Sequence, residues 1–441
     1  MPGYESTTGT GELVLPMAED LPVFNSLDDP IPPLRPDLDI IPIEHQGQSY
    51  LYFHDMLGYA SENLALHRDS ASLLALLDGS RSVRDIISLI HSNGQKDSTS
   101  IHARNLLDQI QQLDRQFLLM SEHYRSYAEE TESVFEKAAV RKPYLAGSSY
   151  PAEPEAISRH FEEIFSKYED KLNTTDNGQI KAVFAPHIDP RVNQEAYVKA
   201  FAPLKGATPD RVVILATSHY SGMYPGVYDD TPFMATRKGY ELPNGTFPAD
   251  GPFIDYLEEH ASEAGINFYD RAHRIEHSIE LHLIHLRHVL GKTIPIVPIL
   301  VGPFDDLLYK PDGFKGQQLK NFANLINSYL EEDELETLFL ISGDLAHVGK
   351  KFGDETPAHN MFEDVKGFDE QFLEAAGQAN PEKLLNAVKS NYDAFRICGF
   401  SPLLSYLTIA PGQKSELAAY ELWDERERES AVTFGTLHYF S

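Results

Sequence analysis

The sequence predicts an α/β protein whose larger part, from about residue 141 to the C-terminus, is a mainly parallel central sheet covered by helices. In this region near-continuous apolar runs of strand length alternate with stretches of helical length. Strands of this kind are typical of parallel sheets enclosed by helices on both faces. The chain of 441 residues is also too long for one ordinary core. A second, smaller domain is therefore expected at the N-terminus.

The composition is that of a globular protein with a strong acidic excess. Hydrophobic residues make up 42% of the chain, and 67 acidic against 37 basic side chains give a formal net charge of -30. This charge repels phosphate backbones and anionic membrane surfaces, so we expect neither a nucleic-acid nor a membrane partner. The sequence shows no signal-peptide pattern, and its single cysteine, Cys398, excludes an internal disulfide. We therefore expect a cytoplasmic protein.

The first 122 residues predict an extended arm followed by a small α+β domain. Residues 1–35 are rich in Pro, Gly and Asp and predict a loosely held arm. Residues 37–59 contain two β-prone runs around a Gly-centred break, which predicts a hairpin. Three helical stretches follow, at residues 71–83, 84–94 and 101–121, and the last runs into a short strand. We therefore predict a winged-helix-like domain over residues 36–122.

The remainder predicts a charged linker helix, residues 123–142, and a large domain, residues 143–441. Apolar runs in the large domain predict strands at 180–187, 211–219, 293–302 and 337–347. The stretches between them predict helices at 195–204, 277–291 and 316–332. Three of the strands end in polar side chains, namely His187, His219, and Asp344 with His347. Ligands bind at the carboxyl ends of strands in such sheets, so the functional site is predicted at this edge.

His187 and His219 are the first candidates for metal ligands. A single histidine after an apolar strand is more often structural, but imidazoles from several strand ends of one sheet converge as first-row metal sites commonly require. Asp189 lies two residues after His187 and just before Pro190. It is interpreted as a further ligand, as a group that orients a ligand, or as a turn cap.

The segment 276–282 is dense in groups that transfer protons or bind metals. On a helix, His277 and Glu280 share a face, whereas His282 lies off it. The order of these residues is not the HExxH of zinc proteases. We expect the three to complete the pocket or to form a second metal position, and we expect His285 and His288 to be packing or surface residues.

Two further groups complete the candidate site. Asp344 can orient the imidazole of His347, an arrangement typical of a general base or of a group that supports a metal. Gly343 beside them allows a close backbone approach. Cys398 lies near Arg396, and positive charge favours the thiolate that binds metals. From the residues alone, a ligand, a reactive thiol and a buried bystander remain open for Cys398.

The N-terminal region resembles the PqqD-like family, whose members bind leader peptides of ribosomally made substrates. The resemblance rests on the phrase LLALLDGSRSVRDI, from Leu73 to Ile86, and on the later LLDQIQQLDRQFLL. It implies a domain that presents a peptide substrate or organises a partner. A structural or dimerising domain is the alternative.

Residues 141–441 are similar to the MEMO family. The similarity rests on seven segments in order: AGSSYP (146–151), APH (185–187), Ser218-His219, EHSIELHL (276–283), IPIVPILVG (294–302), SGDLAHVG (342–349) and ICG (397–399). MEMO domains are similar in fold to class III extradiol ring-cleaving dioxygenases, which hold non-haem Fe(II) at this edge of the sheet. The resemblance implies a triad of His187, His219 and Cys398 for iron or copper, with His347 and Asp344 beside the metal.

The chain departs from the MEMO pattern at three places. APH is followed by Ile188-Asp189-Pro190 rather than Ala-Gly-Tyr, and Tyr220 replaces the second His of the usual SHH. Ser149 stands where an aromatic residue is expected, which argues against the phosphopeptide role described for animal relatives. Oxygen atoms from Asp189 and Tyr220 would favour iron over copper.

We therefore expect a metal-dependent oxidoreductase, a non-haem iron enzyme that activates O₂ on a small-molecule or peptide-derived substrate. The expected cofactor is Fe(II), as one or two ions, with copper as the alternative. The expected metal ligands are His187, His219, Cys398, Asp189 and His282, and the expected catalytic residues are His347, Asp344, His277 and Glu280. A non-enzymatic metal-binding scaffold or adaptor and a di-metal hydrolase are the alternative functions. The oligomeric state is open, with a homodimer among the states that the sequence allows.

Overall fold

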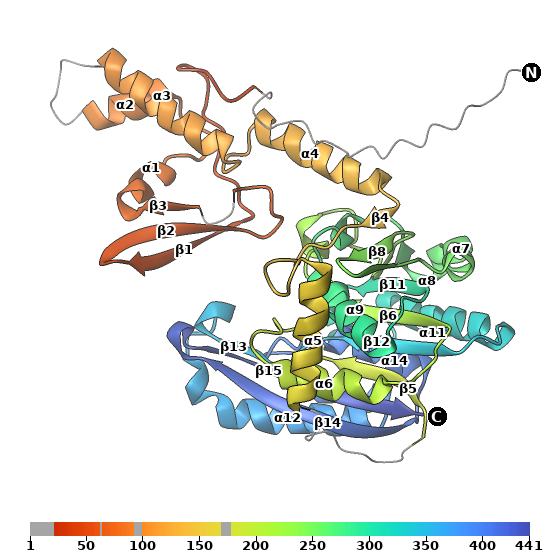
Figure 1. Ribbon diagram of the computed structural model, residues 1–441. Helices are drawn as coiled ribbons and strands as arrows, with labels where there is room; N and C mark the ends of the chain where they lie inside the picture. Colours follow the sequence, from red (N-terminus) through yellow and green to blue (C-terminus); the bar gives the residue numbers. More distant parts are fainter. Residues whose placement is uncertain (1–21, 62–63, 92–98, 169–177) are drawn as a thin grey trace, which may run out of the picture. The chain divides into compact units, whose positions relative to one another are not determined.

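The computed structural model describes residues 22–61, 64–91, 99–168 and 178–441. The chain divides into two compact units, Met1–Lys137 and Ala138–Ser441 (Figure 1). Each unit has a hydrophobic core of its own. Within the described ranges, no helix is both long and apolar enough to cross a membrane.

A small antiparallel sheet forms one side of the N-terminal unit. Its strands are β1 (Leu38–His45), β2 (Gln48–Asp55) and β3 (Ala65–His67), in the order β1-β2-β3. The predicted hairpin is confirmed, because β1 and β2 pair in register from Leu38 with Asp55 to His45 with Gln48. The two turn residues, Gln46 and Gly47, both have positive φ. This is the backbone of a tight two-residue hairpin turn.

Helices α1 (Ala71–Leu74), α2 (Val83–His91), α3 (Thr99–Arg115) and α4 (Glu122–Lys137) make up the rest of this unit. The first is much shorter than the predicted 71–83, because the chain turns at Gly79, where φ is +83°. A new helix then begins behind Ser82. The Ser82 hydroxyl accepts a hydrogen bond from the Asp85 N–H, and the Asp85 carboxylate accepts one from the Ser82 N–H. Such reciprocal bonds start helices.

The described part of the predicted arm is held firmly rather than loosely. Pro30 and Leu34 form β-bridges to Ser82 and Leu119, and Ile31 is buried in the core. The reason is that this stretch carries apolar side chains between its prolines, and their burial outweighs the polar composition. Residues 1–21 of the predicted arm lie outside the described residues.

Helix α4 is packed within the N-terminal unit, whereas the sequence predicts a linker helix at residues 123–142. Tyr124 is buried, and the Arg35 guanidinium lies 4.1 Å from the centre of its ring. Glu132 is also buried and accepts a hydrogen bond from the Tyr59 hydroxyl. Residues after α4 belong to the second unit, where Val140–Arg141 form strand β4.

The second unit is built on a mainly parallel sheet, as predicted. Its described part has nine strands in the order β10-β7-β11-β6-β12-β5-β15-β13, with β14 also paired to β15. The four central strands are parallel: β11 (Ile296–Val301), β6 (Arg211–Thr217), β12 (Thr337–Ser342) and β5 (Ile180–Ala185). The outer strands are β10 (Ile266–Asn267), β7 (Phe233–Ala235), β15 (Ser430–Phe440), β13 (His347–Gly349) and β14 (Lys414–Glu425). The α/β fold class is therefore confirmed.

The antiparallel additions lie at the edges of this sheet. Strand β15 pairs antiparallel with β5, β13 and β14, and β7 pairs antiparallel with β11. A separate three-stranded sheet joins β4 to β8 (Gly239–Leu242) and β9 (Gly245–Phe247).

Helices cover both faces of the central sheet (Figure 1). Alternate residues of β6 point to opposite cores, with Val213 and Leu215 in one and Val212 and Ile214 in the other. The first core includes residues of α7 (Gly251–Glu259), α8 (Ala261–Ala264), α10 (Asp305–Tyr309), α11 (Phe314–Glu332), α12 (Phe362–Gly377), α13 (Pro381–Lys389) and α14 (Phe400–Ile409). The second includes residues of α5 (Pro154–Tyr168), α6 (Gln194–Phe201) and α9 (His277–Leu290).

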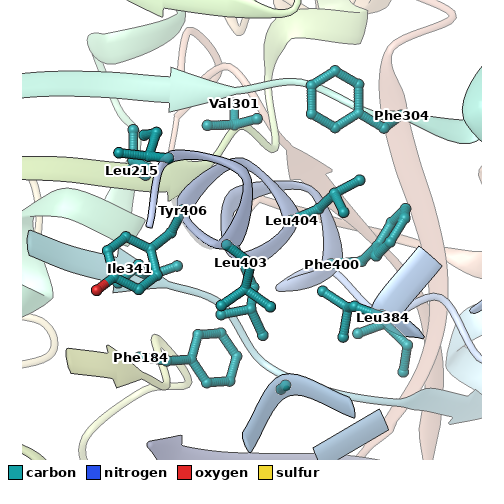
Figure 2. Close-up of a cluster of buried hydrophobic side chains, with 14 of the residues drawn as sticks. Phe184, Leu215, Val301, Phe304, Ile341, Leu384, Phe400, Leu403, Leu404 and Tyr406 are labelled. Atoms are coloured by element: carbon teal, nitrogen blue, oxygen red, sulfur yellow. The ribbon is translucent and has the colours of Figure 1, made fainter. Parts of the chain in front are cut away.

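Helix α14 is apolar on nearly all sides and lies deep in the first core. Figure 2 shows Leu403 and Tyr406 of this helix among side chains that include Phe184, Leu215 and Ile341 of the sheet. A helix that is hydrophobic all round is expected to be buried. Its burial fixes the position of the residues just before it, which include Cys398.

Candidate metal centre

Three strand ends bring polar side chains to one edge of the sheet. His187, His219 and Asp344 each lie two residues beyond the end of a strand, after β5, β6 and β12 respectively. These strands are neighbours, with β12 in the middle. The ring centres of His187 and His219 are 4.8 Å apart. The predicted convergence at the carboxyl edge therefore occurs.

Two glycines let the loop before α14 reach this edge. A Cβ atom on Gly343 would lie 2.1 Å from the Cα of Gly399, so only glycine fits at this contact. The Gly399 N–H donates to the Asp344 carbonyl at 2.9 Å. The Asp344 N–H in turn lies 3.2 Å from the Cys398 sulfur. The close backbone contact thus places the thiol beside the strand ends, with Sγ 3.3 Å from Nε2 of His187.

His187, His219 and Cys398 form a group that could hold a metal ion. Each offers one ligand atom, and these atoms lie within 4.8 Å of one another. Asp344, His347 and Cys398 form a second group by the same measure, and the two groups share the thiol. His187 and Asp344 are almost fully buried, whereas the His219 side chain is 27% exposed. The group is therefore reachable from solvent on the His219 side.

The His187 ring is held in one tautomer by a chain of hydrogen bonds. The Ser342 hydroxyl donates its single proton to the Ser278 carbonyl at 2.7 Å. It can therefore only accept from Nδ1 of His187, which lies 3.0 Å away. The neutral ring carries its proton on Nδ1, and Nε2 presents a free lone pair toward Cys398.

His219 and His347 present Nε2 in the same way. Nδ1 of His219 donates to the Glu276 carboxylate at 2.9 Å. Nδ1 of His347 lies 3.0 Å from the carbonyls of both Leu345 and Arg396, which can only accept. Fixing Nδ1 on an oxygen orients an imidazole and leaves Nε2 for a metal or a proton.

Asp344 supports His187 rather than His347, which corrects the sequence-based expectation. One carboxylate oxygen accepts the backbone N–H groups of His187 at 3.0 Å and of Ile188 at 3.3 Å. The other lies 3.8 Å from Nε2 of His187. The side chain points across to β5, because its own backbone is held against Gly399, and His347 instead bonds to carbonyl groups.

Burial dominates the charge state of the site in the absence of a metal. It raises the pKa of Cys398 well above the usual thiol value, and the nearby Asp344 adds to the effect. It also raises the pKa of Asp344 to about 7, against hydrogen bonds from the His187 and Ile188 N–H groups that lower it. Burial lowers the pKa of His187 well below its usual value, and the neighbouring histidines lower it further. At His219 burial lowers the pKa, but the Glu276 carboxylate outweighs burial and raises it. Burial thus favours the neutral forms of His187 and Cys398, whose lone pairs a cation can use.

This donor set fits a first-row transition metal. Imidazole nitrogens suit iron, copper and zinc, and a thiolate sulfur suits the softer of these ions. The three ligand atoms converge, and the two imidazoles already expose Nε2 lone pairs. A bound ion would replace the thiol proton of Cys398, which removes the cost of burying a charged sulfur.

Glu276 is the site residue that the sequence reasoning missed. It is fully buried at the start of α9, and its carboxylate contacts both His219 and His277. Burial raises its pKa, but His219 and His277 outweigh burial and lower the pKa to about 2. The available signal was its place as the acidic residue directly before a helix, where carboxylates cap the free N–H groups.

His277 lies beside His219, whereas Glu280 is directed away from the strand ends. The His277 ring stacks on His219, with ring centres 4.5 Å apart. Glu280 is directed instead to a buried ion pair with Arg141 and to the Tyr150 hydroxyl. It is one turn further along α9 and meets residues from a segment more than 130 positions earlier. Sequence spacing within the helix gave no sign of those partners.

His282 and Asp189 also lie outside the groups that could hold a metal in the described part of the chain. Nε2 of His282 donates to the Pro186 carbonyl at 3.0 Å, so this ring supports the backbone next to His187. Asp189 accepts from Arg191 and from the Ser149 hydroxyl. Of the three roles considered for Asp189, its bonds to the Arg191 N–H and side chain match the turn cap.

The family comparison covers most of the second unit. A family model described as "Memo-like protein" matches residues 141–438. This range contains every residue of the candidate metal centre. The chain belongs to the Memo-like family. The MEMO resemblance is thereby confirmed, while the PqqD-like resemblance of the N-terminal unit stays a prediction.

Relatives of the Memo-like chain include two bacterial proteins described as MEMO1 family proteins. One, from Aquifex aeolicus, is 24% identical over 418 residues, covering 92% of this chain and all of the relative. One from Thermus thermophilus is 28% identical over 337 residues, covering 76% of this chain and 92% of the relative. The Aquifex match is too long to be confined to the Memo-like domain, so it includes much of the N-terminal unit. Among solved structures, an uncharacterized protein of Escherichia coli K12 is similar at 15% identity with a TM-score of 0.36, covering 59% of this chain and 99% of that one.

Proposed function

We propose that this protein is a metal-dependent oxidoreductase that uses non-haem iron to activate O₂ on a small-molecule or peptide-derived substrate. The observation that carries the proposal is the convergence of His187, His219 and Cys398, with two Nε2 lone pairs already directed by their Nδ1 contacts. His187 and His219 would hold the ion through Nε2 and Cys398 through its thiolate. The bound iron would supply the one-electron chemistry that O₂ activation needs.

The residues around the ligands would handle protons. Burial lowers the pKa of His347 to about 4, so near pH 7 its Nε2 is a proton acceptor. Asp344, with a pKa of about 7, can hold or release a proton on its free oxygen. The pKa of His277 is lowered to about 4 by burial and by the nearby His219. General acid–base groups are most effective when their pKa values lie near the working pH, which favours Asp344 for that role.

The His277 side would admit the substrate. The side chains of His219 and His277 are 27% and 29% exposed, whereas Glu276 behind them is fully buried. A substrate that enters here meets the two stacked rings first. His347, also partly exposed, would then lie near enough to the shared thiol group to exchange protons.

Metal analysis of anaerobically purified protein tests the proposal. We expect iron as the main metal, with a strong loss in His187→Ala, His219→Ala and Cys398→Ser. His260→Ala, which removes an exposed imidazole that bonds to the Tyr256 carbonyl and belongs to no candidate metal group, is the matched control and should keep its metal. Copper as the dominant metal would overturn the assignment of iron. Unchanged metal content in Cys398→Ser would remove the thiol from the ligand set.

Oxygen consumption separates an enzyme from a scaffold. Protein reconstituted with Fe(II) should consume O₂ faster than the same iron mixed with the His187→Ala/His219→Ala variant. Equal rates, with both proteins fully folded by circular dichroism, would argue against O₂ activation and for a metal-binding scaffold.

A further inference from the structure

Glu276 lies at the point where two imidazoles and the start of a helix meet. One carboxylate oxygen accepts Nδ1–H of His219 at 2.9 Å and the N–H groups of His277 and Ser278 at 2.9 and 3.2 Å. Nδ1 of His277 lies 3.3 Å from the same oxygen. The other oxygen accepts the backbone N–H of His219 at 2.8 Å. Both oxygens are thus occupied by N–H donors.

These contacts make Glu276 a poor metal ligand, although its oxygen lies close to His219 and His277. A metal on the carboxylate would have to displace backbone N–H groups that begin α9. Because the side chain is fully buried, the displaced N–H groups could not bond to water instead. Besides capping the helix, Glu276 can therefore act on the site through the two rings that it contacts.

The acceptor at Nδ1 differs between the two histidines of the triad. His187 donates to the neutral hydroxyl of Ser342, and His219 donates to an ionised carboxylate. Hydrogen bonds to a charged acceptor are roughly twice as strong as neutral ones. A carboxylate partner also raises the basicity of a ligating imidazole. His219 is accordingly the more electron-rich of the two nitrogen donors.

We propose that Glu276 is a positioning residue that sets the tautomer and donor strength of His219 and holds His277 beside it. This inference rests on the proposed function, in which His219 holds the metal. The single carboxylate would keep the rings of His219 and His277 stacked, with their centres 4.5 Å apart. The metal ligand His219 and the neighbouring His277 would then be held by the same carboxylate. His187 and His347, which use other acceptors, would be independent of it.

Glu276→Gln tests the proposal, with Glu280→Gln as the matched control. The glutamine keeps the shape of the side chain but removes its charge. Because N–H donors face both carboxylate oxygens, the NH₂ group of the glutamine must replace one acceptor and leave at least one N–H group without a partner. Glu280 is equally buried one turn later on α9, and it bonds to Arg141 and Tyr150 instead of to imidazoles. Glu276→Asp is a second variant, which keeps a charge at the helix start but withdraws it from the rings.

The first readout is the ring ¹⁵N NMR spectrum of the metal-free protein, which distinguishes protonated from free imidazole nitrogens. In the wild type we expect Nδ1 of His187, His219 and His347 to be protonated. In Glu276→Gln the signals of His219 and His277 should shift together, while those of His187 and His347 stay in place. Unchanged signals of His219 and His277 would overturn the proposal.

The second readout is Fe(II) affinity measured by competition with a chelator. We expect a loss of about 10- to 100-fold in Glu276→Gln, the usual effect of removing a group that orients a metal-binding histidine. Glu276→Asp should also lose affinity, and Glu280→Gln should not. An equal loss in Glu280→Gln would reduce Glu276 to a general structural role. If the wild type bound no metal, the proposed function would fail, whereas the NMR spectra would still decide the role of Glu276.

Discussion

Cys398 keeps its proton in the metal-free protein because its charged form is buried next to a carboxyl group. Burial, with Asp344 as the next cause, raises its pKa well above the usual value for a thiol. The Asp344 N–H that faces the sulfur lowers the pKa, but not enough to offset this. The thiol therefore differs from reactive cysteines, which sit in electropositive surroundings.

This charge state predicts slow alkylation of the metal-free protein. Since Cys398 is the single cysteine of the chain, iodoacetamide labelling followed by mass spectrometry reports on this residue alone. We expect the labelling rate to stay low from pH 7 to 9 and to rise above pH 9, since the thiolate is the nucleophile. Fast labelling at pH 7 would contradict a raised thiol pKa.

Asp369 is a buried acid away from the metal ligands. It lies on α12, accepts a hydrogen bond from Tyr420 and has one oxygen with no partner among the described groups. Burial raises its pKa to about 6, although Thr433 and Tyr420 lower it. The folded protein thus holds this proton more tightly than the unfolded chain. The resulting stability is complete below pH ~4 and is lost as the pH rises through 6.

Asp369→Asn should stabilise the protein at pH 8 and weaken its pH dependence. The two-unit difference in pKa corresponds to about 3 kcal/mol, which is the upper limit of the gain. Urea unfolding at pH 5 and pH 8 measures it, with Asp364→Asn on an exposed position of the same helix as the control. If the change in stability between pH 5 and pH 8 were the same in the wild type, Asp369→Asn and Asp364→Asn, this role of Asp369 would be ruled out.

At the scale of elements, the contact between Gly343 and Gly399 determines where the thiol lies. A Cβ atom on Gly399 would lie 2.8 Å from the Asp344 carbonyl and 2.9 Å from the Phe184 ring. Either glycine can gain a side chain only if the end of β12 and the start of α14 move apart. Such a movement would carry Cys398 away from His187.

Gly399→Ala should therefore lower both stability and metal affinity. We expect a loss of roughly 1–3 kcal/mol of unfolding free energy, as for overpacked cores. Gly367→Ala is the control, because a Cβ at this position of α12 meets no atom within 4 Å and alanine favours a helix. Chemical unfolding and Fe(II) titration of both variants would check this. A Gly399→Ala protein as stable as Gly367→Ala would show that the backbone contact is not tight.

The strand ends could be predicted from the sequence, but several side-chain partners could not. His187 and His219 follow apolar runs, and the hydrophobic pattern reveals such strands without knowledge of the rest of the chain. Glu280 shares a helix face with His277, yet it forms a buried ion pair with Arg141, which lies far away in the sequence. Asp189 likewise has a polar partner that satisfies it. Sequence spacing shows which side chains lie near each other on one helix or strand. It does not show which oppositely charged side chain from another segment pairs with them.

The antiparallel pairing in the C-terminal part of the sheet could not be predicted from the sequence either. Strands β14 and β15 pair along their whole length and extend the parallel strands as an antiparallel edge. Pairing between strands of different direction depends on register and burial over the whole sheet. A local pattern does not contain this information.

At the scale of the whole molecule, the second unit contains every residue of the candidate centre and both cores around its sheet. A fragment of residues 138–441 should therefore fold alone and bind metal as the full chain does. Thermal unfolding followed by circular dichroism, together with metal analysis, would check this. A fragment that folds but binds no metal would mean that the N-terminal unit contributes to the centre.

A shorter fragment, residues 144–441, is the matched comparison. It lacks Arg141, whose guanidinium pairs with the fully buried Glu280 and donates to the Glu276 carbonyl. Removing one member of a buried ion pair leaves an uncompensated charge and costs about 3–5 kcal/mol. We expect this fragment to unfold at a lower temperature than residues 138–441. Equal unfolding temperatures would show that Arg141 adds no stability.

The Nδ1 contacts of His187, His219 and His347 bear on how the centre acquires its ion. Protein oxygens hold these rings in place already, so loading needs no refolding of the chain. Zinc fingers, by contrast, fold around their ion and use its binding energy to do so. By the general affinity order such a preformed site would bind copper more tightly than iron, so the proposed iron occupancy depends on iron being the more available ion. Which ion occupies it would then follow from the free concentrations in the surroundings, so growth medium and metal stress should change the occupant without changing the fold.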